Sequence, residues 1–236
     1  MDEEQASIKT LKYLKEIFDK HDIEYWLDEG TLLGAVREKK FIEWDHDIDF
    51  GVWLETIPKI VPLFDEIKDP DYEIYYFDWK NHIKILSKSG EVDINPYHKK
   101  GDIATRRWYE HNKLGEFLDY LIIVLHLGKL KFRKTKANNF LTKILISVRK
   151  ILPKNIIELK VNILLKIFNG IGCKFVEQEI PSHFFTNLST IKFYGMTFKA
   201  PKEKEKYLEF RYGKDWRTPK RDYVYTSDDL SIVKKT

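Results

Sequence analysis

Three aspartates at every second position, Asp45, Asp47 and Asp49, are the residues of this chain best suited to chemistry. On an extended strand alternate side chains point to the same face, so the carboxylates would form a row while Ile48 and Phe50 enter the core. Like charges this close destabilise one another unless a proton or a cation neutralises them. Because carboxylates that hold Mg²⁺ are a common device for binding phosphates, the pattern predicts a divalent-metal site.

Two other interpretations of this acidic row stay open. Acidic residues also line the solvated face of an edge strand, where they prevent pairing with a further strand. A calcium loop of the D-x-D-x-D-G type fits less well, because Phe50 stands where the loop needs a glycine and Thr56 where it needs a glutamate.

Neighbouring segments would bring further groups to the acidic row. Gly30 and Thr31 follow a short predicted strand, 23–27, and open a helix, whose free N–H groups attract anions. Asp93 lies between aliphatic residues on a later strand and adds a separate carboxylate. The order G-[ST], D-x-D and a distant Asp is typical of nucleotidyltransferase-like folds, in which the metal bridges nucleotide phosphates.

The spacing of apolar residues predicts an α/β (α+β) fold. Helices are expected over 7–20 and 56–69, and antiparallel strands over 72–77, 82–87 and 91–94. We therefore expect a nucleotidyltransferase-like mixed sheet flanked by helices, with a basic helical insertion.

Three regions are predicted along the chain. Residues 1–112 would form the catalytic core, 113–175 a basic helical region that faces the acceptor or a membrane, and 176–236 a segment that packs back on the core. Over 113–174 the chain holds 13 Lys or Arg and three acidic residues.

The basic helical region has three interpretations. It is the solvated face of ordinary core helices, a positive groove for an anionic glycan or lipid-linked acceptor, or a set of amphipathic helices on an anionic membrane surface. The 118–125 run and the 129–136 cluster of basic residues motivate the last two. No nucleic-acid-binding module accompanies the charge, so no nucleic-acid partner is expected.

The run LDEGTLLGAVREKKFIEWDHDIDFGV resembles the signature of the LicD / fukutin-related family, L-D-G-G-T-L-L-G-x-x-R followed by W-D-D-D-x-D. The tail, FYGMTFKAPKEKEKYLEFRYGKDWRTP, is similar to the closing segments of that family, and VDINPY stands at its third acidic site. The resemblance covers residues 8–100 and 190–220. Glu29 departs from the family by replacing a glycine, and His46 by replacing the middle aspartate.

The resemblance implies transfer of a substituted phosphate, of the phosphocholine or polyol-phosphate type, from a CDP-activated donor to a hydroxyl of a cell-surface glycan precursor. The cofactor would be Mg²⁺, with Mn²⁺ as a substitute. We assign Asp47 and Asp49 as metal ligands and catalytic residues. Asp93 either completes the metal site or accepts the proton of the attacking hydroxyl. Asp45 either binds the metal or orients a ligand.

The remaining predicted site residues would bind substrate. Gly30 and Thr31 are expected to contact phosphate. Arg37 either pairs with the donor phosphate or covers the carboxylate row as a structural partner. Lys84, on the strand beside Asp93, is either a phosphate ligand or a surface lysine.

Two other functions fit the same residues. In a metal-dependent glycosyltransferase the D-x-D motif would hold a nucleotide sugar, and a non-catalytic protein would use the basic helices to dock on a glycan or membrane. The acidic N-terminus and the absence of a run of about 18 apolar residues predict a cytoplasmic protein. Peripheral contact with the cytoplasmic face of a membrane would run through 114–170.

Overall fold

The computed structural model describes residues 3–45, 47–67, 72–77, 82–87, 90–110 and 174–235, together with scattered, mostly helical positions between 118 and 167. The chain forms two compact units, Met1–Trp108 with Val176–Lys235, and Tyr109–Phe175. His46, Cys173, the 129–136 basic cluster and most of the predicted 114–170 helices lie outside the described residues. Among the described helices none is long and apolar enough to cross a membrane.

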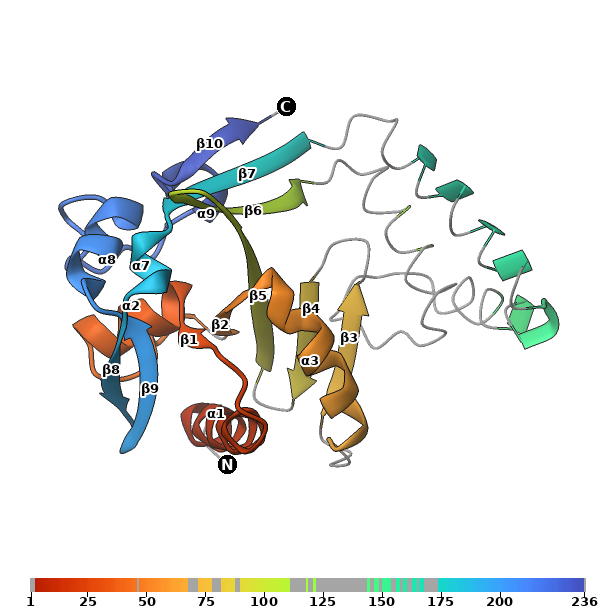
Figure 1. The fold of residues 1–236 in the computed structure, drawn as a ribbon, viewed down its shortest axis with the longest axis horizontal. Coiled ribbons are helices and arrows are strands. Elements are labelled where there is room, and N and C mark those ends of the chain that lie inside the picture. The colour runs from red at the N-terminus through yellow and green to blue at the C-terminus, as the bar shows by residue number, and fades with distance from the viewer. Residues whose placement is uncertain are drawn as a thin grey trace. The chain divides into compact units, whose positions relative to one another are not determined.

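An eight-stranded mixed sheet organises the first unit (Figure 1). The strand order is β1-β2-β5-β6-β7-β10, and β4, which also pairs with β3, joins the sheet at β5. Strands β2 and β5 are parallel, whereas β3, β4 and β5 are antiparallel neighbours, as the sequence predicts. The predicted mixed sheet is therefore confirmed. The bounds are β1 (Trp26–Leu27), β2 (Asp47–Trp53), β3 (Glu73–Phe77), β4 (His82–Ser87), β5 (Gly90–Lys100), β6 (Ile103–Glu110), β7 (Lys174–Pro181) and β10 (Ile232–Lys235).

Helices and one hairpin surround this sheet. The hairpin joins β8 (Leu188–Phe193) to β9 (Met196–Pro201) as a separate two-stranded sheet. The helices are α1 (Glu3–Lys20), α2 (Glu29–Arg37), η1 (Leu54–Thr56), α3 (Ile57–Ile60), η2 (Val61–Asp65), α7 (His183–Thr186), α8 (Lys204–Tyr212) and α9 (Tyr225–Asp228).

The helix predicted over 56–69 is wrong as one element. The structure divides that segment into η1, α3 and η2. Pro58 and Pro62 stand at the first turns of α3 and η2. Proline has no N–H to donate and clashes with the preceding turn, so the apolar stripe cannot be carried by one continuous helix.

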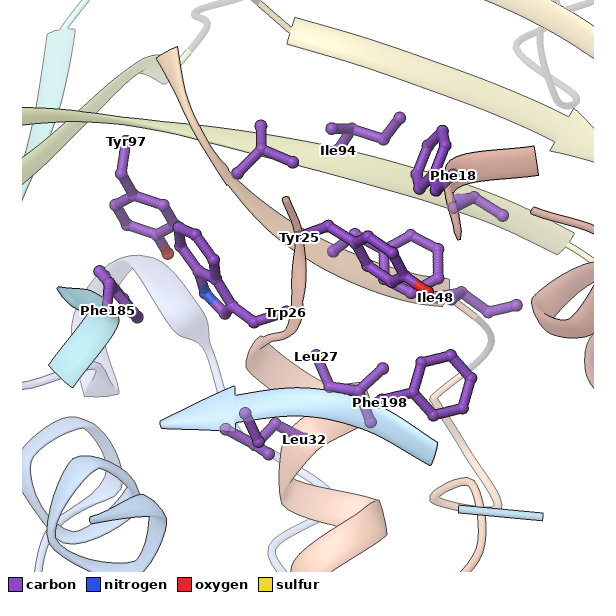
Figure 2. Close-up of a cluster of buried hydrophobic side chains, with 14 of the residues drawn as sticks. Phe18, Tyr25, Trp26, Leu27, Leu32, Ile48, Ile94, Tyr97, Phe185 and Phe198 are labelled. Carbon is purple, nitrogen blue, oxygen red and sulfur yellow. The ribbon is translucent and has the colours of Figure 1, made fainter. Parts of the chain in front are cut away.

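The two faces of β2 have different surroundings. Ile48 and Phe50 are buried on one face, where Phe18 of α1 meets Phe50 edge-to-face with ring centroids 6.0 Å apart. Figure 2 shows Phe18, Tyr25 and Ile48 in this apolar cluster. The alternate residues of β2, which include both of its aspartates, point to the other face. The core on one side thus fixes which side the carboxylates occupy.

Beyond the aspartates, that second face is closed by an aromatic stack. Trp26 is fully buried and stacks on Phe185 with ring centroids 4.7 Å apart, with Tyr97 beside them (Figure 2). A Cβ atom on Gly51 would lie 2.1 Å from Trp26 Nε1. Only glycine at position 51 therefore leaves room for the indole this close to β2.

We expect Gly51→Ala to lower the free energy of unfolding by about 3 kcal/mol, since the added methyl group overlaps a buried ring that has no room to move. The matched control is Gly195→Ala, in the β8–β9 turn. Gly195 has a φ of +75° and open space around its Cβ position, so only backbone strain of about 1 kcal/mol is added. Urea unfolding of both variants measures the difference, and equal losses would contradict the packing role of Gly51.

Candidate active site

The acidic residues come from two adjacent parallel strands. In the register of β2 and β5, Asp47 pairs with Glu91 and Asp49 pairs with Asp93. Paired residues of neighbouring strands point to the same face of a sheet. Because β2 lies between β1 and β5, the interpretation as a solvated edge strand is wrong. The extended backbone of β2 also excludes the calcium loop.

Three carboxylates on this face form a cluster that could hold a cation. Oxygen atoms of Asp47, Glu91 and Asp93 all lie within 4.8 Å of one another, and each residue is half-buried. Glu91 is not among the residues predicted from the sequence. Its signal was the alternation Glu91-Val92-Asp93, which repeats the D-x-D spacing on the second strand.

Lys84 neutralises part of this cluster. On β4, Lys84 pairs with Asp93, and its Nζ lies 2.5 Å from Glu91 Oε2 and 3.5 Å from Asp93 Oδ1. Burial lowers the pKa of Lys84, but attraction to Asp93 and Glu91 outweighs burial and raises it. The lysine is therefore a charged member of the site, and not an isolated surface residue.

Asp49 lies beside the cluster and is held by Asp28 and the first turn of α2 (the turn 28–31). Its backbone N–H donates to Thr31 Oγ1 at 2.9 Å, and its carbonyl accepts the Asp28 N–H at 3.1 Å. Its carboxylate, which is buried, accepts a 3.3 Å hydrogen bond from Asn95 Nδ2. Burial raises the pKa of Asp49 well above its usual range, and the negative charge of Glu29 adds to this effect.

Asp45 does not continue the row on β2. It precedes the strand, and its carboxylate lies against Gly30, where a Cβ would be 1.8 Å from Asp45 Oδ2. Glycine at position 30 is therefore required for this close approach. The Thr31 hydroxyl, which we predicted to contact phosphate, accepts the Asp49 N–H in a buried position.

Arg37 contacts different groups from those predicted. Its Nε and Nη2 donate to Glu38 Oε1 at 3.1 and 2.6 Å, and its Nη1 donates to the Trp216 carbonyl at 3.2 Å. These contacts join the end of α2 to the segment after α8. In this structure Arg37 therefore has a structural partner, although that partner is not the carboxylate row.

The donor set of the cluster fits a hard divalent cation. All of its ligand atoms are carboxylate oxygens, the type that Mg²⁺ and Mn²⁺ prefer. Within the described part of the chain, Asp47 Oδ1 and Asn95 Oδ1 are buried oxygens without a hydrogen-bond donor. Buried polar atoms rarely lack a partner, and a cation would supply one for Asp47.

The electrostatics of Asp47 point the same way. Burial, followed by the charges of Asp93 and Glu91, raises its pKa to about 6. In the absence of a cation, the ionised Asp47 carboxylate therefore destabilises the folded protein near neutral pH.

We expect Asp47→Asn to stabilise the cation-free protein by about 1–3 kcal/mol at pH 8. The pKa of Asp47 is about 6 in the folded state against an ordinary 3.8. Asp47 therefore lowers the free energy of unfolding by its full amount above about pH 6, and it has no such effect below about pH 4. The free energy of unfolding of both proteins, measured in EDTA at pH 4, 6 and 8, tests this. An Asn variant that is less stable than the unaltered protein at pH 8 would contradict it.

Comparison with known proteins identifies the family of this chain. The model of the LicD/FKTN/FKRP nucleotidyltransferase domain matches residues 22–138. Ribitol 5-phosphate transferase FKRP of Homo sapiens is 24% identical over 134 residues, which cover 50% of this chain and 26% of that protein. Lipopolysaccharide cholinephosphotransferase LicD of Haemophilus influenzae is 40% identical over 63 residues, which cover 27% of this chain and 24% of that protein. The chain spans about a quarter of the length of these relatives.

A solution structure of the antibiotic-resistance factor ANT(2'')-Ia aligns with 71% of this chain and 93% of that chain, at a TM-score of 0.35 and 11% identity. Nothing about function follows from so distant a likeness. The family model, in contrast, spans about half of the chain and includes α2, β2 and β5. This chain therefore belongs to the LicD/FKTN/FKRP family, and the acidic face of β2 and β5 lies within the matched nucleotidyltransferase domain.

Proposed function

We propose that this protein transfers a substituted phosphate from a CDP-activated donor to a hydroxyl of a cell-surface glycan precursor, with a divalent cation, Mg²⁺ or Mn²⁺, as cofactor. One observation carries the proposal. Carboxylate oxygens of Asp47, Glu91 and Asp93 converge within 4.8 Å on adjacent strands, and Asp47 Oδ1 is buried without a donor.

Asp47, Glu91 and Asp93 would hold the cation, with Asp49 as the fourth carboxylate of the same sheet face. A bound Mg²⁺ supplies charge neutralisation for the diphosphate and stabilises CMP as the leaving group. Asp93 is also the candidate base for the attacking hydroxyl, as predicted from the sequence.

The chain itself positions these groups before any substrate arrives. The turn 28–31 holds the backbone of Asp49 through two hydrogen bonds. Lys84 keeps a positive charge beside Glu91 and Asp93, where it can meet a phosphate oxygen. Because such groups need no rearrangement at the moment of reaction, their electrostatic effect is fully available to the transition state. Gly30, Thr31 and Arg37 remain proposed phosphate contacts.

The substrate classes rest on the relatives. One relative is named a ribitol 5-phosphate transferase and the other a lipopolysaccharide cholinephosphotransferase. Both names describe transfer of a substituted phosphate, and the second also names a glycan-bearing acceptor. We extend these two features to this chain, with a glycan or a lipid-linked glycan as acceptor.

The basic helical region is the proposed contact with the acceptor or with the cytoplasmic face of a membrane. Among its described residues, large apolar side chains face solvent, with 81% of Ile151 and 60% of Leu159 exposed. Lys150 and Lys160, next to them in the chain, are also exposed. Exposed apolar side chains beside lysines suit an anionic lipid surface.

We expect CDP-linked donors to stabilise the protein against heat in the presence of Mg²⁺, and EDTA to abolish the effect. A ligand that binds at 100 times its dissociation constant adds about 2.7 kcal/mol to the free energy of unfolding. Thermal unfolding with CDP-, UDP- and GDP-linked compounds measures it. Stabilisation by UDP or GDP compounds alone would support a nucleotide-sugar glycosyltransferase in place of the proposed function.

We expect Asp47→Asn and Glu91→Gln each to slow release of CMP from a CDP-linked donor about 100-fold or more, because each removes a direct cation ligand. The matched control is Glu24→Gln, whose carboxylate is exposed and paired with Lys199 at 3.3 Å. CMP release, measured on variants with unchanged circular dichroism, tests both substitutions. Unaltered rates in both site variants would favour a non-catalytic binding protein.

A further inference from the structure

Glu29, the residue that departs from the family glycine, joins two arginines from distant parts of the chain. It opens α2 with a φ of +44°, a left-handed conformation that favours glycine. Its Oε1 accepts hydrogen bonds from Arg106 Nη1 of β6 at 2.7 Å and from Arg211 Nη2 of α8 at 3.2 Å. These two charged hydrogen bonds offset the backbone strain.

The two arginines are held very differently. Arg211 is 3% exposed, and its guanidinium also binds Asp229 and the Tyr207 hydroxyl. The side chain of Arg106 is 17% exposed, and its guanidinium lies over the Trp108 ring, 5.1 Å from the centroid. If Arg106 left Glu29, the carboxylate would keep Arg211, so no buried charge would be stranded. Arg106 is therefore the exchangeable partner.

Trp108 presents a second donor beside Arg106. Its indole Nε1 is buried and has no acceptor within the part of the chain that the structure describes. Arg106 and Trp108 are two residues apart on β6, so both side chains leave the same face of the strand. A guanidinium and an unpaired indole N–H together suit an anion with several oxygens.

This pair of donors adjoins the acidic site through Glu29. Glu29 belongs to the turn 28–31, which holds the backbone of Asp49 from both sides. Arg106 thus binds Glu29 from β6, next to the turn that holds Asp49, whereas Lys84 of β4 binds Glu91 and Asp93 directly. A diphosphate bound to a cation between these strands would have a positive group on either side.

We propose that Arg106 and Trp108 form an anion subsite for the diphosphate of the activated donor, and that Glu29 holds Arg106 until the diphosphate replaces it. The choice of a nucleoside diphosphate as ligand rests on the proposed function. In this arrangement Glu29 is a competitor of the substrate anion for Arg106. Neutralising Glu29 and neutralising Arg106 must therefore change anion affinity in opposite directions.

Titration calorimetry tests whether the two substitutions change anion affinity in opposite directions. The two probes are CDP with Mg²⁺ and inorganic pyrophosphate in EDTA. We expect Arg106→Gln to weaken binding of CDP about tenfold or more, as for loss of a charged hydrogen bond. Glu29→Gln is expected to tighten binding severalfold. Arg106→Lys retains the charge and should bind more tightly than Arg106→Gln. Arg107→Gln is the matched control, because Arg107 leaves the opposite face of β6, is 58% exposed and pairs with Glu177.

The outcomes separate the subsite from the proposed function. The subsite is overturned, and the proposed function stands, if Arg106→Gln leaves CDP binding unchanged. The same conclusion follows if Glu29→Gln weakens CDP binding while its melting temperature is unaltered. If CDP fails to bind but pyrophosphate binds in a way that depends on Arg106, the proposed function is overturned and the subsite stands. Binding of neither probe to the unaltered protein would count against both.

Discussion

Repulsion among carboxylates is the constraint on which the rest of this structure depends. The parallel pairing of β2 with β5 sets Asp47 beside Glu91 and Asp49 beside Asp93 on one face of the sheet. Four acidic side chains so placed are unfavourable unless opposite charge is supplied. Lys84 supplies part of it, and the unpaired oxygen of Asp47 shows that the compensation is incomplete. A cation at this site would supply the missing positive charge. It would bind strongly because it would remove the repulsion that destabilises the cation-free protein.

The surrounding fold holds these charges in place with a second, buried set of polar contacts. The Asp28 carboxylate is fully buried and accepts hydrogen bonds from Tyr97 at 2.7 Å and Tyr207 at 2.5 Å. Arg211 joins the same network by donating to the Tyr207 hydroxyl at 3.1 Å, and it also binds Glu29 and Asp229. Because α8 and the segment before β10 contribute together with β5, the turn that holds Asp49 depends on the C-terminal part of the chain as well as on β5. The conformation of a four-residue turn thus depends on contacts almost two hundred residues away.

Local sequence predicted those elements whose signal lies within a few neighbouring residues. The alternation of aspartates with Ile48 and Phe50 indicated a strand with one buried face, and both apolar residues are buried on β2. The apolar periodicity of 56–69 does not specify one helix, because Pro58 and Pro62 cannot donate backbone hydrogen bonds within a continuous helix and stand instead at the starts of α3 and η2. The predicted row of three aspartates on one strand is also wrong for Asp45. It lies before β2 and packs on Gly30, so the spacing of three aspartates does not describe three strand positions.

The sequence by itself determined which groups are candidates for the site, since residue types and short-range spacing are enough to indicate a strand with carboxylates, a helix start and a second acidic strand. Only the tertiary structure decided which carboxylates meet. Asp47 and Glu91 stand 44 positions apart, and their pairing follows from the register of two parallel strands, which no local pattern specifies. The same is true of Glu29, whose partners on β6 and α8 come from the folding of the whole unit. The register of the strands and the packing of the whole unit therefore decide which side chains meet in the site. The distance between two side chains far apart in sequence depends on how all the elements between them fold.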